Sequence, residues 1–203
     1  MLKKSTLPAQ YEKTFHIDLL NDKHEAFKVN LFAFLILLPF VAIYLYLYHH
    51  EIIVLNLNTN QTGELIYQIS LLIVASWLLF TIYILIHEGI HAIVFKLFSN
   101  DKVKFGFHGL YASASMPHSY FKKRHYLMAA LAPLVVMTIV FIVLLNLTQN
   151  QVFLVIYILF AFHISGCTGD IYISLKLLKF PKDTYINDYG VGMTFYTKKE
   201  KTN

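Results

Sequence analysis

The stretch TIYILIHEGIHAIVFKLF at residues 81–98 decides the fold of this chain, because it ends an apolar segment that runs from residue 65 to residue 98. A helix needs about 20 apolar residues to cross the hydrocarbon core of a membrane. On such a helix, His87 and His91 lie one above the other on a single face, so both imidazoles can bind one metal ion. Glu88 stands beside them as a candidate general base that activates water. Because these groups are costly in hydrocarbon, the segment predicts a functional metal site.

The composition of the whole chain agrees with a membrane protein. Of its 203 residues, 57% are hydrophobic and 14% are charged, which departs far from the averages of soluble proteins. Four apolar segments are each long enough for a spanning helix, at residues 31–48, 65–98, 126–147 and 152–178. We therefore predict an all-α membrane protein with four transmembrane helices.

The placement of positive charge predicts the orientation of these helices. All 17 lysine and arginine residues lie within residues 3–28, 96–124 and 176–201, and the connections at 49–64 and 146–151 contain none. The positive-inside rule then places both termini and the middle loop in the cytoplasm, as in a multi-pass protein of the cytoplasmic membrane. Because the formal net charge of +5 comes from these loops, it indicates contact with anionic lipid headgroups and not with nucleic acid.

The chain divides into three parts. Residues 1–28 are polar and are predicted to form a cytoplasmic segment, part helix and part loop. Residues 29–180 contain the four-helix membrane domain, with its core at 65–178. Residues 181–203 follow as a cytoplasmic tail.

The middle loop carries the pattern of a strand. Val103, Phe105 and Phe107 alternate with polar or small residues, and Pro117 ends the region. We predict a short cytoplasmic β-hairpin here, between the second and third helices. The three apolar residues are candidates for substrate binding, because a strand can hold an extended peptide by strand addition.

A catalytic zinc site usually takes three protein ligands, so a third must come from another segment. The fourth apolar segment offers His163 and Asp170, which share one helix face because seven residues make nearly two turns. Counted from the cytoplasmic ends, Asp170 lies level with His91, whereas His163 lies about one turn deeper than His87. Asp170 is therefore the preferred third ligand, and His163 a neighbouring or substrate-stabilising group. An exchange of these two roles stays open. Cys167 could be a soft ligand, but it is better explained as a small buried apolar residue.

These motifs resemble those of a known group. HEGIH on one segment, a strand-bearing loop and Gly-Asp at 169–170 resemble the site-2 protease group of intramembrane zinc proteases, and more closely a small bacterial membrane family of zincin peptidases. The resemblance covers residues 65–178. It implies Zn²⁺ ligands at His87, His91 and Asp170, and a catalytic base at Glu88. The chain departs from the usual Asn-x-x-Pro-x-x-x-Leu-Asp-Gly pattern, since it lacks that proline and Leu-Asp-Gly. His163 stands one residue out of register with the asparagine.

The resulting expectation is a zinc metalloprotease of the bacterial cytoplasmic membrane. It would hydrolyse peptide bonds of membrane-embedded or membrane-associated peptides and proteins near the cytoplasmic side. Two alternatives remain, a catalytically inactive metal-binding scaffold and a metal-ion transporter. Of twelve acidic residues only Glu88 and Asp170 lie in apolar segments, and both are near the cytoplasmic ends. That clustering favours a site over an ion path across the whole membrane.

Overall fold

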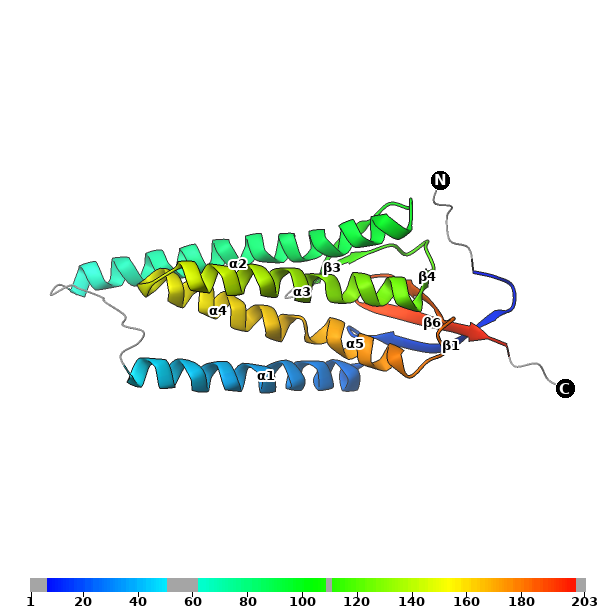
Figure 1. The fold of residues 1–203 in the computed structure, drawn as a ribbon, viewed down its shortest axis with the longest axis horizontal. Helices are drawn as coiled ribbons and strands as arrows, with labels where there is room; N and C mark the ends of the chain where they lie inside the picture. Colours follow the sequence, from blue (N-terminus) through cyan, green and yellow to red (C-terminus); the bar gives the residue numbers. More distant parts are fainter. Residues whose placement is uncertain (1–6, 51–61, 109–110, 200–203) are drawn as a thin grey trace.

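Five helices and six strands form the described part of the chain, which comprises residues 7–50, 62–108 and 111–199 of a computed structural model. Their order is β1–α1–α2–β2–β3–β4–α3–α4–α5–β5–β6. Figure 1 shows the helices lying alongside one another as an elongated bundle. The strands β1, β4 and β6 lie at one end of that bundle.

Four helical spans are long and apolar enough to cross a membrane, which confirms the four predicted apolar helices. The helices are α1 (Lys23–His49), α2 (Thr62–Phe98), α3 (Lys123–Leu147), α4 (Asn150–Gly166) and α5 (Thr168–Leu178). The fourth span runs through both α4 and α5. Many large apolar side chains of these helices point outward, among them Trp77 of α2 at 65% exposure. Such a surface suits a lipid environment better than water.

The fourth apolar segment is not one continuous helix, as the sequence had suggested, but breaks at Cys167. The Thr168 hydroxyl donates to the carbonyl of Ser165 over 2.5 Å, which satisfies a carbonyl that the end of α4 leaves free. A new helix, α5, then begins, and its first turn contains Asp170. The break therefore places a carboxylate at a helix N-terminus, where the helix dipole favours negative charge.

The N-terminal segment and the C-terminal tail form a β-sheet, which the sequence analysis did not predict. Four antiparallel strands lie in the order β1–β6–β5–β4. They are β1 (Tyr11–Asp18), β6 (Gly192–Lys198), β5 (Tyr185–Asp188) and β4 (Phe121–Lys122). The expected part-helix, part-loop structure of residues 1–28 is thus wrong for Tyr11–Asp18, which pairs with β6.

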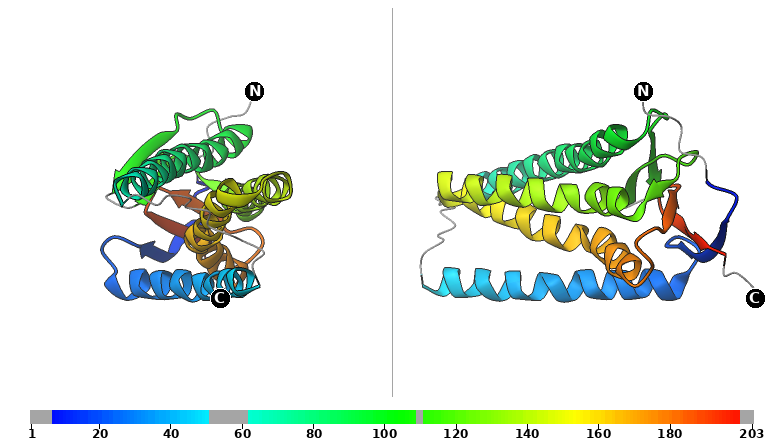
Figure 2. Two further views of the ribbon diagram at one scale, coloured as in Figure 1. Left: turned by 90° about the vertical axis from the view of Figure 1, so that its left-hand side faces the viewer. Right: turned by 45° about the vertical axis from the view of Figure 1, so that its right-hand side comes forward.

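The sheet is packed against the bundle by one apolar core. Phe15 lies opposite Phe195 and Ile17 opposite Met193 in the register of β1 and β6. These residues pack in one cluster with side chains of α2, α3 and α5, including the fully buried Leu177. Figure 2 shows the sheet beyond the ends of α3 and α5, in its right-hand view. The sheet therefore fixes the ends of the helices that carry the candidate site.

A separate two-stranded sheet lies between α2 and α3, where a hairpin was expected. Its antiparallel strands are β2 (Lys104–His108) and β3 (Tyr111–Ser115). Phe105 pairs with Ala114 and Phe107 with Ala112. Of the two strands, β3 packs against α2.

The first helix is held against the fourth span by polar contacts. The Tyr157 hydroxyl donates to the carbonyl of Phe40 over 2.7 Å, and the Ser165 hydroxyl donates to that of Ala33 over 3.0 Å. Glu25, near the start of α1, pairs with Lys176 and accepts a hydrogen bond from Tyr172. These contacts join α1 to α4 and α5.

Candidate metal centre

His87 and His91 lie on one face of α2, on successive turns. Their exposed fractions are 8% and 7%, and their ring centroids are 4.9 Å apart. The Nδ1 atom of His91 lies 2.8 Å from the carbonyl oxygen of Ala129 on α3. Because a carbonyl only accepts, this Nδ1 carries the proton and Nε2 keeps its lone pair in the neutral ring.

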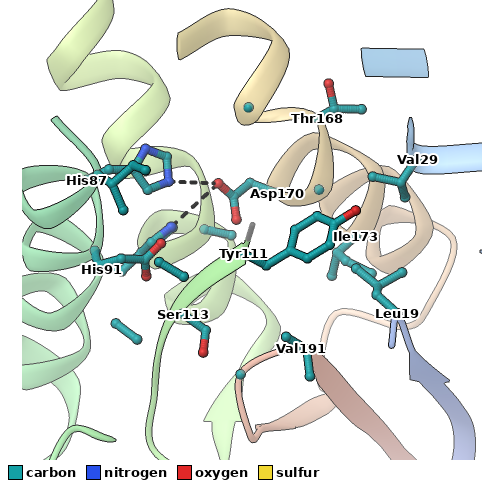
Figure 3. A pocket seen from close by; sticks show the side chains of 18 of the residues that line it. Leu19, Val29, His87, His91, Tyr111, Ser113, Thr168, Asp170, Ile173 and Val191 are labelled. Carbon is teal, nitrogen blue, oxygen red and sulfur yellow. Dashed lines mark ion pairs between the residues drawn. The ribbon is translucent and has the colours of Figure 1, made fainter. Parts of the chain in front are cut away.

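Asp170 faces both imidazoles from α5. Its Oδ2 atom lies 3.5 Å from Nε2 of His87 and 3.5 Å from Nε2 of His91, as the dashed lines in Figure 3 mark. The three residues thus converge on one point from two helices. One nitrogen or oxygen of each lies within 4.8 Å of the others, a grouping that could hold a metal ion.

The donor set and its spacing suit zinc. Zinc takes imidazole nitrogen and carboxylate oxygen at about 2.0–2.2 Å, in tetrahedral geometry. Two ligand atoms at those distances lie roughly 3.3–3.6 Å apart. The separations of 3.5 Å between Oδ2 and each Nε2 atom match that spacing. Two imidazoles and one carboxylate also leave a fourth position for water or substrate, as catalytic zinc sites do.

Glu88 lies next to this group and is half-buried. Its carboxylate faces the backbone N–H of Ala114 on β3. This contact ties the candidate base to the edge of a strand. The side chain is therefore held beside the metal ligands but takes no part in their cluster.

A pocket of about 370 Å³ surrounds the site and is lined by α1, α2, β3, α5 and the turn between β5 and β6. Figure 3 shows Tyr111 and Ser113 of β3 beside the two histidines and Asp170. The hydroxyl of Tyr111 donates to the Asn30 side chain over 3.0 Å, which links β3 to α1 across the pocket. The volume of this pocket falls within the range of small-ligand pockets, about 300–1,000 Å³.

His163 and Cys167 form a second group around His87. The His163 side chain is fully buried, and its Nδ1 atom lies 3.6 Å from the sulfur of Cys167. Ligating atoms of His87, His163 and Cys167 also lie within 4.8 Å of one another. The structure therefore brings every candidate ligand from the sequence together, in two clusters that share His87.

The expected substrate-binding residues do not line this pocket. Phe105 and Phe107, on β2, are 59% and 69% exposed, and Val103 packs against the core cluster shared by the helices and the four-stranded sheet. The hairpin residues that line the pocket all belong to β3, at Tyr111 and at residues 112–114. The alternation of apolar residues in the sequence located the hairpin, but it lies on β2, which does not line the pocket.

The sequence analysis did not single out two polar residues of this region. Tyr83, one turn before His87, places its hydroxyl 3.2 Å from the Nδ1 atom of that histidine. Asp188, at the end of β5, lines the pocket and accepts hydrogen bonds from the Tyr126 hydroxyl over 2.8 Å and the Gly190 N–H over 2.7 Å. Burial raises the pKa of Asp188 to about 7, against the lowering effect of these two donors. Spacing alone could have drawn attention to Tyr83, which lies four residues before His87.

Comparisons with known proteins add one match. The model of a family described as "Putative zincin peptidase" matches residues 79–185, just over half of the chain. This region extends from the turn before Tyr83 to the start of β5, so it contains all the candidate ligands and Glu88. No curated protein and no solved structure matches the chain.

Proposed function

The chain belongs to the family of putative zincin peptidases, and from this membership we propose that it is an intramembrane zinc metallopeptidase of the site-2 protease type. Zinc is the cofactor that the family implies. The observation that carries the proposal is the position of Asp170 Oδ2, 3.5 Å from Nε2 of His87 and of His91. These three groups meet among helices that are apolar enough to span a membrane.

The roles of the residues follow from their chemistry. His87, His91 and Asp170 would hold the ion through Nε2, Nε2 and a carboxylate oxygen. Bound zinc polarises a scissile carbonyl and lowers the pKa of a water molecule. Glu88 takes the proton from the attacking water and passes it to the leaving amine. The N–H of Ala114 holds the Glu88 carboxylate in place for both transfers.

The substrate is a peptide segment bound in extended form along β3. Because the Ala114 N–H faces Glu88, we infer that it points away from β2 and that the free edge of β3 faces the site. Ala112, two residues earlier, has the same orientation, since backbone groups alternate along a strand. A peptide that paired with this edge would lie beside Glu88 with its backbone exposed to attack.

The charge distribution supports cleavage near the cytoplasmic side. The positively charged regions flank the ends of the spans at which the strands lie, and by the positive-inside rule this supports a cytoplasmic position for this end of the bundle. The partners would then be the lipid bilayer of a bacterial cytoplasmic membrane and a membrane-anchored peptide or protein. Cleavage occurs where a substrate helix leaves the hydrocarbon and can unwind.

The test is cleavage by purified protein in lipid vesicles. A fluorescent peptide library with one apolar span and varied cytoplasmic flanks would supply substrates, and mass spectrometry would locate the cut. We expect Glu88→Gln to lower the rate by about 10²–10⁴-fold while zinc content is unchanged. Glu64→Gln, at the start of the same helix, serves as the control and should cleave normally.

Two results would argue for other functions. Zinc bound without cleavage of any peptide would favour the inactive scaffold. Zinc carried across sealed vesicles, with no cleavage, would favour the transporter. Equal cleavage by wild type and Glu88→Gln would contradict the assigned role of Glu88.

A further inference from the structure

The hydroxyl of Tyr83 lies between two imidazoles in the interior of the bundle. It is 3.2 Å from Nδ1 of His87, on the same helix, and 3.0 Å from Nδ1 of His163, on α4. All three side chains are buried, with exposed fractions of 7%, 8% and 0%. A tyrosine hydroxyl has one proton, so it can donate to only one of these nitrogens and must accept from the other.

The far side of the His163 ring decides the direction. Its Nε2 atom lies 3.2 Å from the Thr138 hydroxyl of α3, and the ring also faces the carbonyl of Leu134, one turn earlier on α3. A carbonyl has no proton to give, so this side of His163 is the donor. In the neutral ring Nδ1 is then the acceptor, and the Tyr83 hydroxyl donates to it.

The same chain of hydrogen bonds determines which ring nitrogen of His87 carries the proton. Since the Tyr83 proton goes to His163, the Tyr83 oxygen accepts from Nδ1–H of His87. The Nε2 lone pair of His87 is then free toward Asp170, 3.5 Å away. His91 reaches the same state more directly, because its Nδ1 donates to the Ala129 carbonyl.

We propose that Tyr83 and His163 are positioning residues, which hold His87 as the Nδ1–H tautomer with Nε2 aimed at the metal position. The inference rests on the proposed function, because it concerns a ligand of the proposed zinc site. The hydrogen bond that a ligand histidine makes through its other nitrogen sets both its tautomer and its ring orientation. His163 therefore acts through Tyr83 and does not touch the substrate.

A metal ion held by His87, His163 and Cys167 is the competing interpretation of the same cluster. It would require the Nδ1 lone pair of His163, at which the Tyr83 hydroxyl already lies 3.0 Å away. It would also leave the Tyr83 hydroxyl without its acceptor in an apolar interior, which is costly. The hydrogen-bonded chain accounts for both Tyr83 contacts and for the far side of His163, and we therefore prefer it.

The experiment measures zinc affinity in detergent by competition with a chelator, without substrate. Tyr83→Phe removes only the hydroxyl, and His163→Leu removes only the acceptor, so each should weaken zinc binding about 10–100-fold. The double variant should bind no more weakly than either single one, because both break the same chain. His163→Gln should restore most of the affinity, since its side-chain carbonyl can accept from Tyr83.

A matched control and a spectroscopic measurement separate positioning from a general loss of structure. Tyr157→Phe also removes a buried hydroxyl, the one that donates to Phe40, and should bind zinc like the wild type. Nitrogen-15 NMR of histidine-labelled, zinc-loaded protein should show His87 protonated at Nδ1. Tyr83→Phe should lose that signature.

Three results would overturn the inference. Unchanged zinc affinity in Tyr83→Phe, with tight binding by the wild type, would overturn it and leave the proposed function standing. Zinc lost in Cys167→Ala and His163→Gln but kept in Asp170→Ala would assign the metal to the other cluster. A wild type that binds no zinc would overturn the proposed function and the inference together.

Discussion

Asp170 Oδ2 lies 3.5 Å from Nε2 of His91, across the interface between α5 and α2. The helix break at Cys167 starts a new helix just before this carboxylate. His87 lies at the same distance from the same oxygen. A carboxylate shared by two buried imidazoles is the arrangement from which the proposed zinc site follows.

Proline at Ala112 should disturb substrate binding without disturbing the metal. Proline removes an N–H that points away from β2, so the ladder between β2 and β3 stays intact while the free edge of β3 loses a donor. We expect a rise in KM of about tenfold with unchanged zinc content, which corresponds to the loss of one hydrogen bond of roughly 1–1.5 kcal/mol. Steady-state cleavage kinetics and metal analysis would check both.

Phe107→Pro is the matched control for that change. Phe107 pairs with Ala112, so its N–H points to the free edge of β2 and its loss also spares the ladder. The kinetics of this variant should resemble those of the wild type. If Phe107→Pro raised KM and Ala112→Pro did not, the substrate strand would be β2, as the sequence alone had suggested.

Hydropathy and spacing were enough to predict the four apolar helices and the residues around His87. Both signals are local, because a spanning helix must satisfy its own backbone and a helix places i and i+4 on one face. The depth comparison that selected Asp170 also needed only helix geometry. The structure then placed Asp170 against both histidines.

The sheet could not be predicted in the same way. Its strands β1 and β6 pair residues such as Phe15 and Phe195, from opposite ends of the chain. Pairing between such distant segments depends on tertiary packing, and the local sequence of one polar segment does not indicate it. The role of β3 was missed for a related reason, since Ala112 and Ser113 are small and lack the alternation that marked β2.

Alanine at Gly190 should destabilise the protein. Gly190 has φ of +105°, and an added Cβ would lie 2.8 Å from Oγ of Ser113 on β3. The left-handed backbone alone costs about 1–3 kcal/mol for a residue with a side chain. We expect a lower unfolding temperature in detergent, by several degrees.

Gly63→Ala provides the control for Gly190. An added Cβ at Gly63 meets nothing within 4 Å, and the residue lies in α2. Alanine in a helix should leave the unfolding temperature equal or slightly higher. Equal unfolding temperatures for Gly190→Ala and the wild type would show that the turn tolerates a side chain.

Asp188 should make stability depend on pH in the metal-free protein. Its pKa is raised by burial to about 7 in the folded state, from an ordinary value of 3.8. Because the folded state binds the Asp188 proton more tightly than the unfolded state does, this group stabilises the folded state fully below pH 4. The contribution is lost as the pH rises through about 7. Asp188→Asn should therefore gain stability relative to the wild type between pH 5 and pH 8, on the order of a few kcal/mol at most.

Thermal unfolding after removal of zinc by a chelator would measure that gain. Asp183→Asn is the control, because Asp183 is exposed and its pKa is lowered by Lys198, 2.7 Å away. Its contribution is complete above pH 4, so it should not vary between pH 5 and pH 8. A constant difference between Asp188→Asn and the wild type over this range would refute the titration of Asp188.

The predicted orientation can be tested with single cysteines. The native Cys167 is fully buried and should not react with a maleimide that cannot cross membranes. Gln149→Cys, between α3 and α4, should be labelled in intact bacteria, whereas Lys102→Cys, after α2, should be labelled only in permeabilised cells. The opposite pattern would invert the topology and place the site near the outer surface.

The three-ligand zinc site is tested most directly by the zinc content of the purified wild type beside His87→Ala, His91→Ala and Asp170→Ala. We expect about one zinc ion per chain in the wild type and a loss of most of it in each variant, because catalytic zinc has three protein ligands. Absence of zinc from the wild type after addition of the metal, or its full retention in Asp170→Ala, would contradict the proposed site.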